Sequence, residues 1–120
     1  MDFIRALAMD RLPCVYLLAN GRNGTLYIGV TSDLVKRVHQ HREHVLDGFA
    51  SRHGVDALVW YERHETMESA ILREKQMKKW NRAWKVRLID KTNPSWRDLW
   101  PDITDQIPRS KVLGFPPARE

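Results

Sequence analysis

The sequence predicts an α+β fold in which helices pack around a three-stranded antiparallel sheet. Two apolar runs, PCVYLLA and TLYIGV, flank a segment with two Asn-Gly pairs, the pattern of a β-hairpin. A later run, DALVWYERHE, has the composition of a third strand. Most of the intervening and following sequence has helical periodicity. The 120 residues suffice for one compact domain but not for two.

The first helix is expected over residues 33–46, directly after the hairpin. Thr31 or Ser32 can serve as its N-cap, because a hydroxyl oxygen accepts from the first free backbone N–H groups. Residues 47–55 are expected to form a loop, and the third strand covers residues 56–65.

Two further helices are expected over residues 67–80 and 82–91, with Thr66 and Asn81 as their N-caps. Asn93 should end the second of them, because the proline that follows disfavours helix at the residue before it. A short helix is expected over 95–100.

Three regions follow from this pattern. Residues 1–12 form an N-terminal extension, residues 13–103 form the domain, and residues 104–120, with three prolines and little periodicity, form a flexible tail.

The composition favours a soluble protein with a polyanionic partner. The net charge is +5 and the sequence pI is about 9.7, which favours nucleic acid, although many small basic domains bind nothing specific. A single cysteine excludes an internal disulfide framework and a cysteine-based zinc site. We expect no membrane association and a cytoplasmic location, because no apolar run is long enough to span a bilayer and the N-terminus lacks a signal-peptide pattern.

Tyr16 and Tyr27 occupy the two strands of the expected hairpin. Ten residues, an even number, lie between them, so a regular hairpin without a bulge places both phenols on one face. Gly29 shares that face and is expected to leave an open patch where a ligand could approach. The alternative is that both tyrosines are ordinary strand residues that pack against their neighbours.

The first helix carries polar residues where its apolar face should meet the sheet. The helical periodicity of Leu34, Val38 and Val45 predicts an apolar residue at position 41, where the sequence has His41. Arg37 lies one turn earlier on the same side. His41 is either a functional residue or a hydrogen-bonded core histidine. A zinc site is not expected, because His39 and His41 point to opposite sides of a helix.

Glu74 is a similar anomaly on the second helix. It falls in the middle of an apolar stripe made by four residues: Met67, Ala70, Ile71 and Met77. A buried carboxylate is costly unless it is paired or binds a metal. The alternatives are therefore a metal ligand or an ion pair with Arg37 or a neighbouring lysine.

Residues 73–91 form a basic segment. It holds eight Lys and Arg residues against two acidic residues, a net charge of +6 compared with +5 for the whole chain. Trp80 and Trp84 lie one helical turn apart within it, and they serve either core packing or base stacking.

Taken in order, these residues resemble the GIY-YIG nuclease family. CVY at 14–16 stands for the first element and YIG at 27–29 for the second; Arg37, His41 and Glu74 follow. The framework over about residues 13–100 looks most like small standalone bacterial members. Cys14 replaces the first glycine, and Val30 stands where some members carry a lysine.

The resemblance implies hydrolysis of a phosphodiester with Mg²⁺ or Mn²⁺. Tyr16 and Tyr27 match the two tyrosines around the scissile phosphate, and Arg37 matches the catalytic arginine. His41 matches a position often filled by histidine or tyrosine, and Glu74 matches the metal-binding carboxylate. Six residues of the basic segment are expected to bind nucleic acid: Arg73, Lys75, Lys78, Lys79, Arg82 and Lys85.

The expected activity is therefore that of a metal-dependent DNA endonuclease. DNA is the expected substrate, and branched or damaged DNA, in repair or recombination, is one option among its forms. An RNA-directed nuclease and a nucleic-acid-binding module with little or no catalysis are the alternatives.

Overall fold

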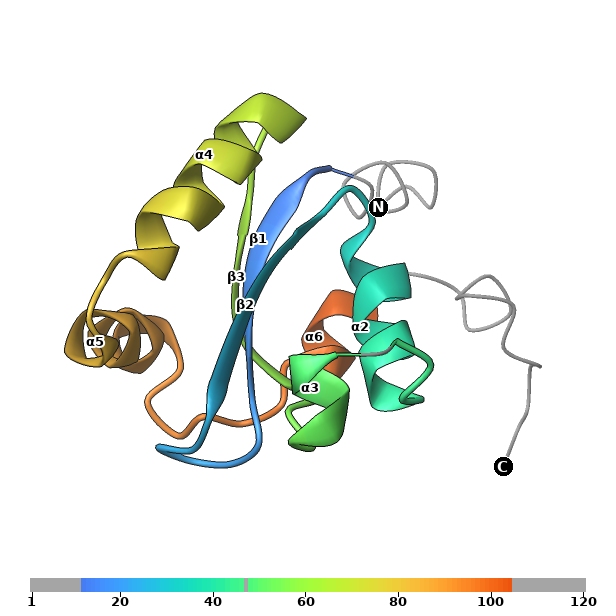
Figure 1. Ribbon diagram of the computed structural model, residues 1–120, viewed down its shortest axis with the longest axis vertical. Coiled ribbons are helices and arrows are strands. Elements are labelled where there is room, and N and C mark those ends of the chain that lie inside the picture. The colour runs from blue at the N-terminus through green and yellow to red at the C-terminus, as the bar shows by residue number, and fades with distance from the viewer. Residues whose placement is uncertain (1–11, 47, 105–120) are drawn as a thin grey trace.

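The computed structural model describes residues 12–46 and 48–104 (Figure 1). It contains a three-stranded antiparallel sheet of order β2-β1-β3, with β1 (Cys14–Ala19) between β2 (Leu26–Thr31) and β3 (Ala57–Arg63). Helices cover both faces, which confirms the predicted fold class. Residues 1–11 of the predicted N-terminal extension and residues 105–120 of the predicted tail lie outside the described residues.

Among the described residues, five helices surround the sheet (Figure 1): α2 (Leu34–Arg42), α3 (Phe49–Arg52), α4 (Met67–Lys78), α5 (Arg82–Thr92) and α6 (Trp100–Thr104). One face is covered by α2, α3 and α6, and the other by α4 and α5. Every residue of β1 is buried because this central strand has helices on both sides. Its sequence is accordingly apolar throughout.

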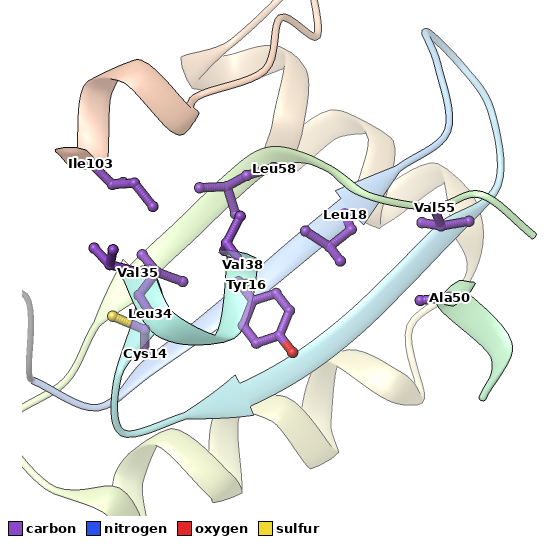
Figure 2. Close-up of a cluster of buried hydrophobic side chains, with 10 residues drawn as sticks. All are labelled: Cys14, Tyr16, Leu18, Leu34, Val35, Val38, Ala50, Val55, Leu58 and Ile103. Atoms are coloured by element: carbon purple, nitrogen blue, oxygen red, sulfur yellow. The ribbon is translucent and has the colours of Figure 1, made fainter. Parts of the chain in front are cut away.

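The alternation of side chains along β1 divides the core in two. Cys14, Tyr16 and Leu18 point into the cluster on the α2 side (Figure 2). Val15, Leu17 and Ala19 point into the cluster on the α4 side, with Met77 and Ile89. The phenol of Tyr16 thus belongs to a largely apolar core.

The helix ends follow from side-chain caps. Thr66 accepts a hydrogen bond from Ser69 N at 3.1 Å and Asn81 accepts one from Trp84 N at 2.9 Å, as predicted. The predicted cap of the first helix is wrong. Asp33, rather than Thr31 or Ser32, accepts from a backbone N–H of the first turn, that of Lys36, at 3.1 Å. Thr31 Oγ1 instead accepts a hydrogen bond from Asp33 N, and Asp33 precedes the first helical residue.

The largest differences from the predicted elements lie in three places. The loop expected at 47–55 contains α3, and α2 ends at Arg42 instead of residue 46. The helix expected at 95–100 begins at residue 100 and continues to Thr104, the first residue of the predicted tail.

Tertiary hydrogen bonds account for the missing helix at 95–100. Asn93 Nδ2 donates to the carbonyls of Val59 and Arg97, and Leu99 N donates to the carbonyl of Leu58. These bonds tie the segment to β3 and use backbone groups that a helix would need.

Within the described part of the chain, every helix is too short or too polar to cross a membrane.

Candidate active site

Tyr16 and Tyr27 share one face of the β1–β2 hairpin. Tyr16 pairs with Gly29 and Leu18 pairs with Tyr27, with no shift of register between the two strands. The ring centroids of the tyrosines lie 6.3 Å apart. Tyr16 is fully buried, whereas Tyr27, on the edge strand, is partly exposed. The predicted shared face is confirmed, and only Tyr27 reaches solvent.

Gly29 does not leave an open patch, so that expectation is wrong. A Cβ atom at this position would lie 2.4 Å from Cζ and from Oη of Tyr16. The space beside Gly29 is therefore filled by the Tyr16 ring. Glycine is required here because the two strands bring this ring against the backbone of β2.

His41, on α2, is buried against both tyrosines. Its Nε2 lies 3.0 Å from Tyr16 Oη, and its ring centroid lies 5.4 Å from that of Tyr27. Burial lowers the pKa of His41 to about 4, and the charge of Arg37 acts in the same direction. The imidazole is therefore neutral at pH 7. This is a hydrogen-bonded histidine in the core, one of the two alternatives for this position.

Tyr16 is also held in its neutral form. Burial raises the pKa of its phenol, and the neighbouring Tyr27 adds to the rise. Arg37 acts in the opposite direction on the pKa of Tyr16, so its guanidinium lies within electrostatic reach of the phenol. Because Tyr16 keeps its proton, it can donate to Nε2 of the neutral imidazole. Arg37 is the cation of this cluster.

Glu74 is buried on α4, as predicted, with a residual exposure of 9%. Its Oε2 lies 2.8 Å from Lys78 Nζ, so the neighbouring lysine is its ion-pair partner. The pKa of Lys78 is raised chiefly by its hydrogen bond to Glu74, with a smaller contribution from Tyr27. Lys78 therefore links the α4 carboxylate electrostatically to the phenol on β2.

The apolar stripes around these polar residues are shorter than predicted. Met67 is 36% exposed and Ile71 is 38% exposed, so only Ala70 and Met77 bury the α4 face that carries Glu74. Val45 is 65% exposed because α2 ends before it. Glu74 is consequently buried near the solvent-facing edge of the core.

Among the described residues, Glu74 is the carboxylate considered for a metal at this site. Among residues 12–46 and 48–104, no group of three or more His, Cys, Asp or Glu side chains is placed to hold a metal ion. Mg²⁺ commonly keeps several waters and is held by one or two carboxylates together with substrate phosphates. Glu74 fits that type of site, whereas a cage made by the protein alone does not form in the described residues.

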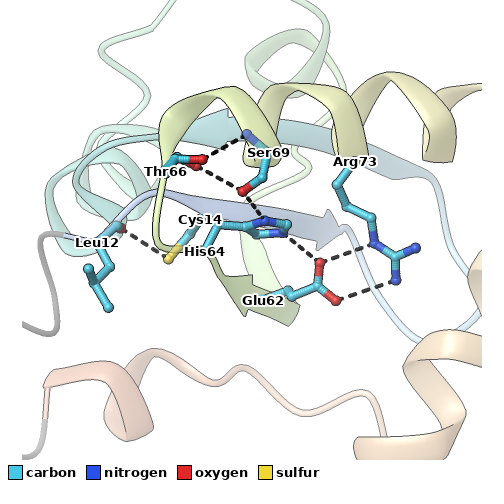
Figure 3. Close-up of polar contacts among 7 residues, drawn as sticks. All are labelled: Leu12, Cys14, Glu62, His64, Thr66, Ser69 and Arg73. Atoms are coloured by element: carbon cyan, nitrogen blue, oxygen red, sulfur yellow. Dashed lines mark hydrogen bonds and ion pairs between the residues drawn. The ribbon is translucent and has the colours of Figure 1, made fainter.

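The six predicted nucleic-acid-binding residues are not equivalent in the structure. Arg73 donates to both carboxylate oxygens of Glu62, which also contacts His64 (Figure 3), and it lies over the Trp80 ring. Arg82 donates to the carbonyls of Asn23 and Gly24 at 2.8 and 2.7 Å. Lys78 pairs with Glu74. Of the remaining three, Lys75 and Lys79 are exposed and Lys85 is partly buried.

The pairing of Lys78 with Glu74 was not singled out from the sequence. The available signal was the i, i+4 spacing, with the glutamate on the N-terminal side, which is the favourable orientation for a helix pair. Several lysines follow Glu74 in the sequence, so only the spacing could indicate which of them forms the ion pair.

The two phenols and the Arg37 guanidinium lie on the α2 side of the edge strand β2, and the Glu74 carboxylate lies on α4, on its other side. Such groups define a class of site suited to a phosphate. The family model of the GIY-YIG catalytic domain matches residues 12–87, more than half of the 120-residue chain. The chain belongs to this family, and its fold is that of a nuclease. No match to a curated protein or to a solved structure accompanies this finding.

The two departures from the family pattern have different surroundings. Cys14 is buried in the α2-side cluster, where it packs as a core residue. Val30 packs against the α4-side cluster, the side from which Lys78 comes. Tyr27 contributes to the rise in the pKa of Lys78, so the two groups interact electrostatically.

Proposed function

We propose that this chain is a metal-dependent endonuclease that hydrolyses phosphodiester bonds in DNA. The observation that carries the proposal is the match to the GIY-YIG catalytic domain over a stretch in which Arg37 is coupled electrostatically to Tyr16, and Lys78, the partner of Glu74, to Tyr27 of the edge strand β2. An edge strand lets an extended polymer approach from solvent. The basic segment on α4 and α5 adds the charge that a polyanion requires.

The two tyrosines take different roles in this proposal. Tyr27 is partly exposed and can orient the attacking water through its hydroxyl group. Tyr16 is fully buried, its pKa is raised, and its hydroxyl is engaged with His41. We therefore assign water contact to Tyr27, and to Tyr16 and His41 the positioning of that face of the site.

Charge on the phosphate is met by two groups of the chain. Arg37 offers planar donors suited to two phosphate oxygens as negative charge develops on them. Glu74 would hold Mg²⁺ or Mn²⁺, which when bound would stabilise charge on the phosphate and on the leaving oxygen. Lys78 holds the carboxylate in place through its ion pair.

A cleavage assay tests the proposal. Purified full-length protein is incubated with labelled branched, nicked, single-stranded and duplex DNA, and with RNA, in Mg²⁺, Mn²⁺ or EDTA. We expect cleavage of DNA that requires metal and that Glu74→Gln abolishes. Glu68→Gln, an exposed carboxylate on the first turn of the same helix, is the matched control and should retain activity. Preference for branched or damaged DNA would support a role in repair or recombination.

The second candidate function is a nucleic-acid-binding module with little catalysis. The Glu74–Lys78 ion pair favours it, because this pair must open or share the carboxylate before a cation can bind. Tight DNA binding in EDTA without cleavage in any metal would select this alternative.

A further inference from the structure

Trp84 is an exposed aromatic side chain on α5. Half of its surface is open to solvent, whereas tryptophan is usually largely buried. Packing of this residue in the core, one of the two roles considered from the sequence, is therefore wrong. Its ring meets the Trp80 ring edge to face, with centroids 5.9 Å apart and an interplanar angle of 76°.

An open hollow of about 280 Å³ lies beside this ring. Five residues line it: Trp80, Trp84, Arg87, Leu88 and Lys91. Arg87 and Lys91 follow Trp84 by three and seven residues, so the helix places both cations on the face that carries the indole. We call this hollow the α5 groove.

The charges around the α5 groove favour an anionic ligand. Arg87 and Lys91 are exposed on its rim, and the neighbouring Asp90 accepts a hydrogen bond from Trp96 Nε1 at 2.7 Å. Trp80 has a cation over its own ring, with the Arg73 guanidinium 5.2 Å from the centroid. Trp84 is thus the more accessible of the two rings, and cations lie one turn away along the helix.

We propose that the α5 groove binds an unpaired nucleotide of single-stranded DNA. The base stacks on Trp84, and Arg87 and Lys91 neutralise the adjoining phosphates. Stacking needs an exposed base face, which a single strand offers and an intact duplex keeps within its own stack. The identity of the polymer rests on the proposed nuclease function, and Leu88 and Lys91 lie beyond the segment matched by the family.

The fold holds the α5 groove in a fixed relation to Tyr27. Arg82, the first residue of α5, donates to the carbonyls of Asn23 and Gly24 in the turn that leads into β2. Tyr27 follows three residues after Gly24. Figure 1 shows α5 on the same side of the sheet as α4, which carries Glu74. A DNA strand bound in the α5 groove is therefore held at a fixed position relative to the proposed cleavage site.

The test is binding without cleavage. Fluorescence anisotropy in EDTA measures the Kd of the full chain for a labelled 20-nucleotide single strand and for the same sequence as a duplex. We expect Trp84→Leu, which keeps apolar bulk but removes the aromatic face, to weaken single-strand binding about tenfold. Trp84→Phe should retain most of the affinity for the single strand. In Trp84→Leu the Kd for the duplex should change by less than about twofold.

Leu72→Ala is the matched control, because Leu72 is 59% exposed on α4 and outside the groove. An unchanged single-strand Kd in Trp84→Leu overturns the proposal. Equal losses of affinity for the single strand and for the duplex overturn it as well. So does a result in which Trp84→Leu disrupts a dimer of this chain but leaves DNA binding unchanged.

The outcome is separable from that of the proposed nuclease activity. A selective loss of single-strand binding supports the α5 groove even if the wild-type protein cleaves nothing in Mg²⁺ or Mn²⁺. Metal-dependent cleavage together with unaltered binding by Trp84→Leu supports the nuclease and rejects the groove.

Discussion

The two faces of the sheet treat polar groups in opposite ways. On the α2 face, Tyr16 and His41 form a hydrogen-bonded pair that is buried and neutral, because burial raises the pKa of the phenol and lowers that of the imidazole. On the α4 face, Glu74 and Lys78 form a charged pair whose lysine is 56% exposed.

The difference between these two pairs shows where a small domain can hold charged groups. A charged group deep in the core is costly, so the two buried polar groups of the α2 face, Tyr16 and His41, are neutral and bonded to each other. A charge next to solvent keeps part of its hydration, so the α4 face can hold a carboxylate beside an edge strand. We therefore expect the buried Tyr16–His41 pair to govern stability, and the groups nearer to solvent, Tyr27, Arg37 and Glu74, to govern activity.

The largest effect is expected from Glu74→Gln. Cleavage should fall by about three orders of magnitude, since loss of metal-assisted charge stabilisation costs several kcal/mol. The free energy of unfolding should change by about 1 kcal/mol or less, because the exposed Lys78 ammonium can be hydrated once its partner is neutral. Cleavage rate, DNA affinity and melting temperature are measured on one preparation.

That expectation differs from the cost of breaking a fully buried ion pair, which is about 3–5 kcal/mol. A large fall in melting temperature with cleavage intact in the folded fraction would show that Glu74 is structural. Glu68→Gln again provides the control.

The two tyrosines should separate activity from stability. Tyr27→Phe removes a partly exposed hydroxyl, so we expect cleavage to fall by about a hundredfold with stability within about 0.5 kcal/mol of wild type. Tyr16→Phe removes the buried partner of His41 Nε2 and should cost about 1–3 kcal/mol of stability. Urea denaturation and initial cleavage rates measure the two effects.

A reversed result, with Tyr16→Phe stable and Tyr27→Phe unfolded, would contradict the division between buried and solvent-facing groups. Wild-type cleavage by Tyr27→Phe would remove the assignment of water contact to this residue.

The sequence predicted the hairpin, the third strand and the two longer C-terminal helices because local signals mark them. Asn-Gly turns, Thr66 and Asn81 act within a few residues of their own position. The segment at 95–100 was mispredicted because its backbone is bonded to β3, far away in the chain. Such long-range bonds leave little trace in helical periodicity.

The site shows the same division. The buried positions of His41 and Glu74 were readable as polar residues on apolar faces. The role of Gly29 was not, because the Tyr16 ring that fills its space arrives from the opposing strand. The exposure of Trp84 depends on how α5 packs, and α5 buries only Ile89 among its own residues.

Protonation of His41 should destabilise the protein in acid. Its pKa in the folded state, about 4, lies below the ordinary value of 6.5, so the unfolded chain binds the proton more readily. The contribution is fully present above about pH 6.5 and is lost as the pH falls towards 4. The loss amounts to about 3 kcal/mol at most.

His41→Gln tests this, because the amide can still accept from Tyr16 but does not titrate. The free energy of unfolding is measured from pH 7 to pH 4, and the wild type should lose more stability over this interval than the variant. Parallel curves for the two proteins would show that His41 does not titrate as the structure indicates.

The smallest effect is expected from Lys75→Ala combined with Lys79→Ala. Both side chains are exposed on the α4 face, away from the ion pairs that occupy Arg73 and Lys78. If both contact phosphates, the slope of log Kd against log salt for duplex DNA should decrease by about 1.8, or about 0.9 for each contact. Cleavage at saturating DNA should stay near wild type, because neither residue touches the reacting phosphate. Binding titrations at four salt concentrations give the slope. An unchanged slope would place the duplex-binding surface elsewhere on the molecule. A loss of cleavage at saturating DNA would place these lysines nearer to the scissile bond than the structure indicates.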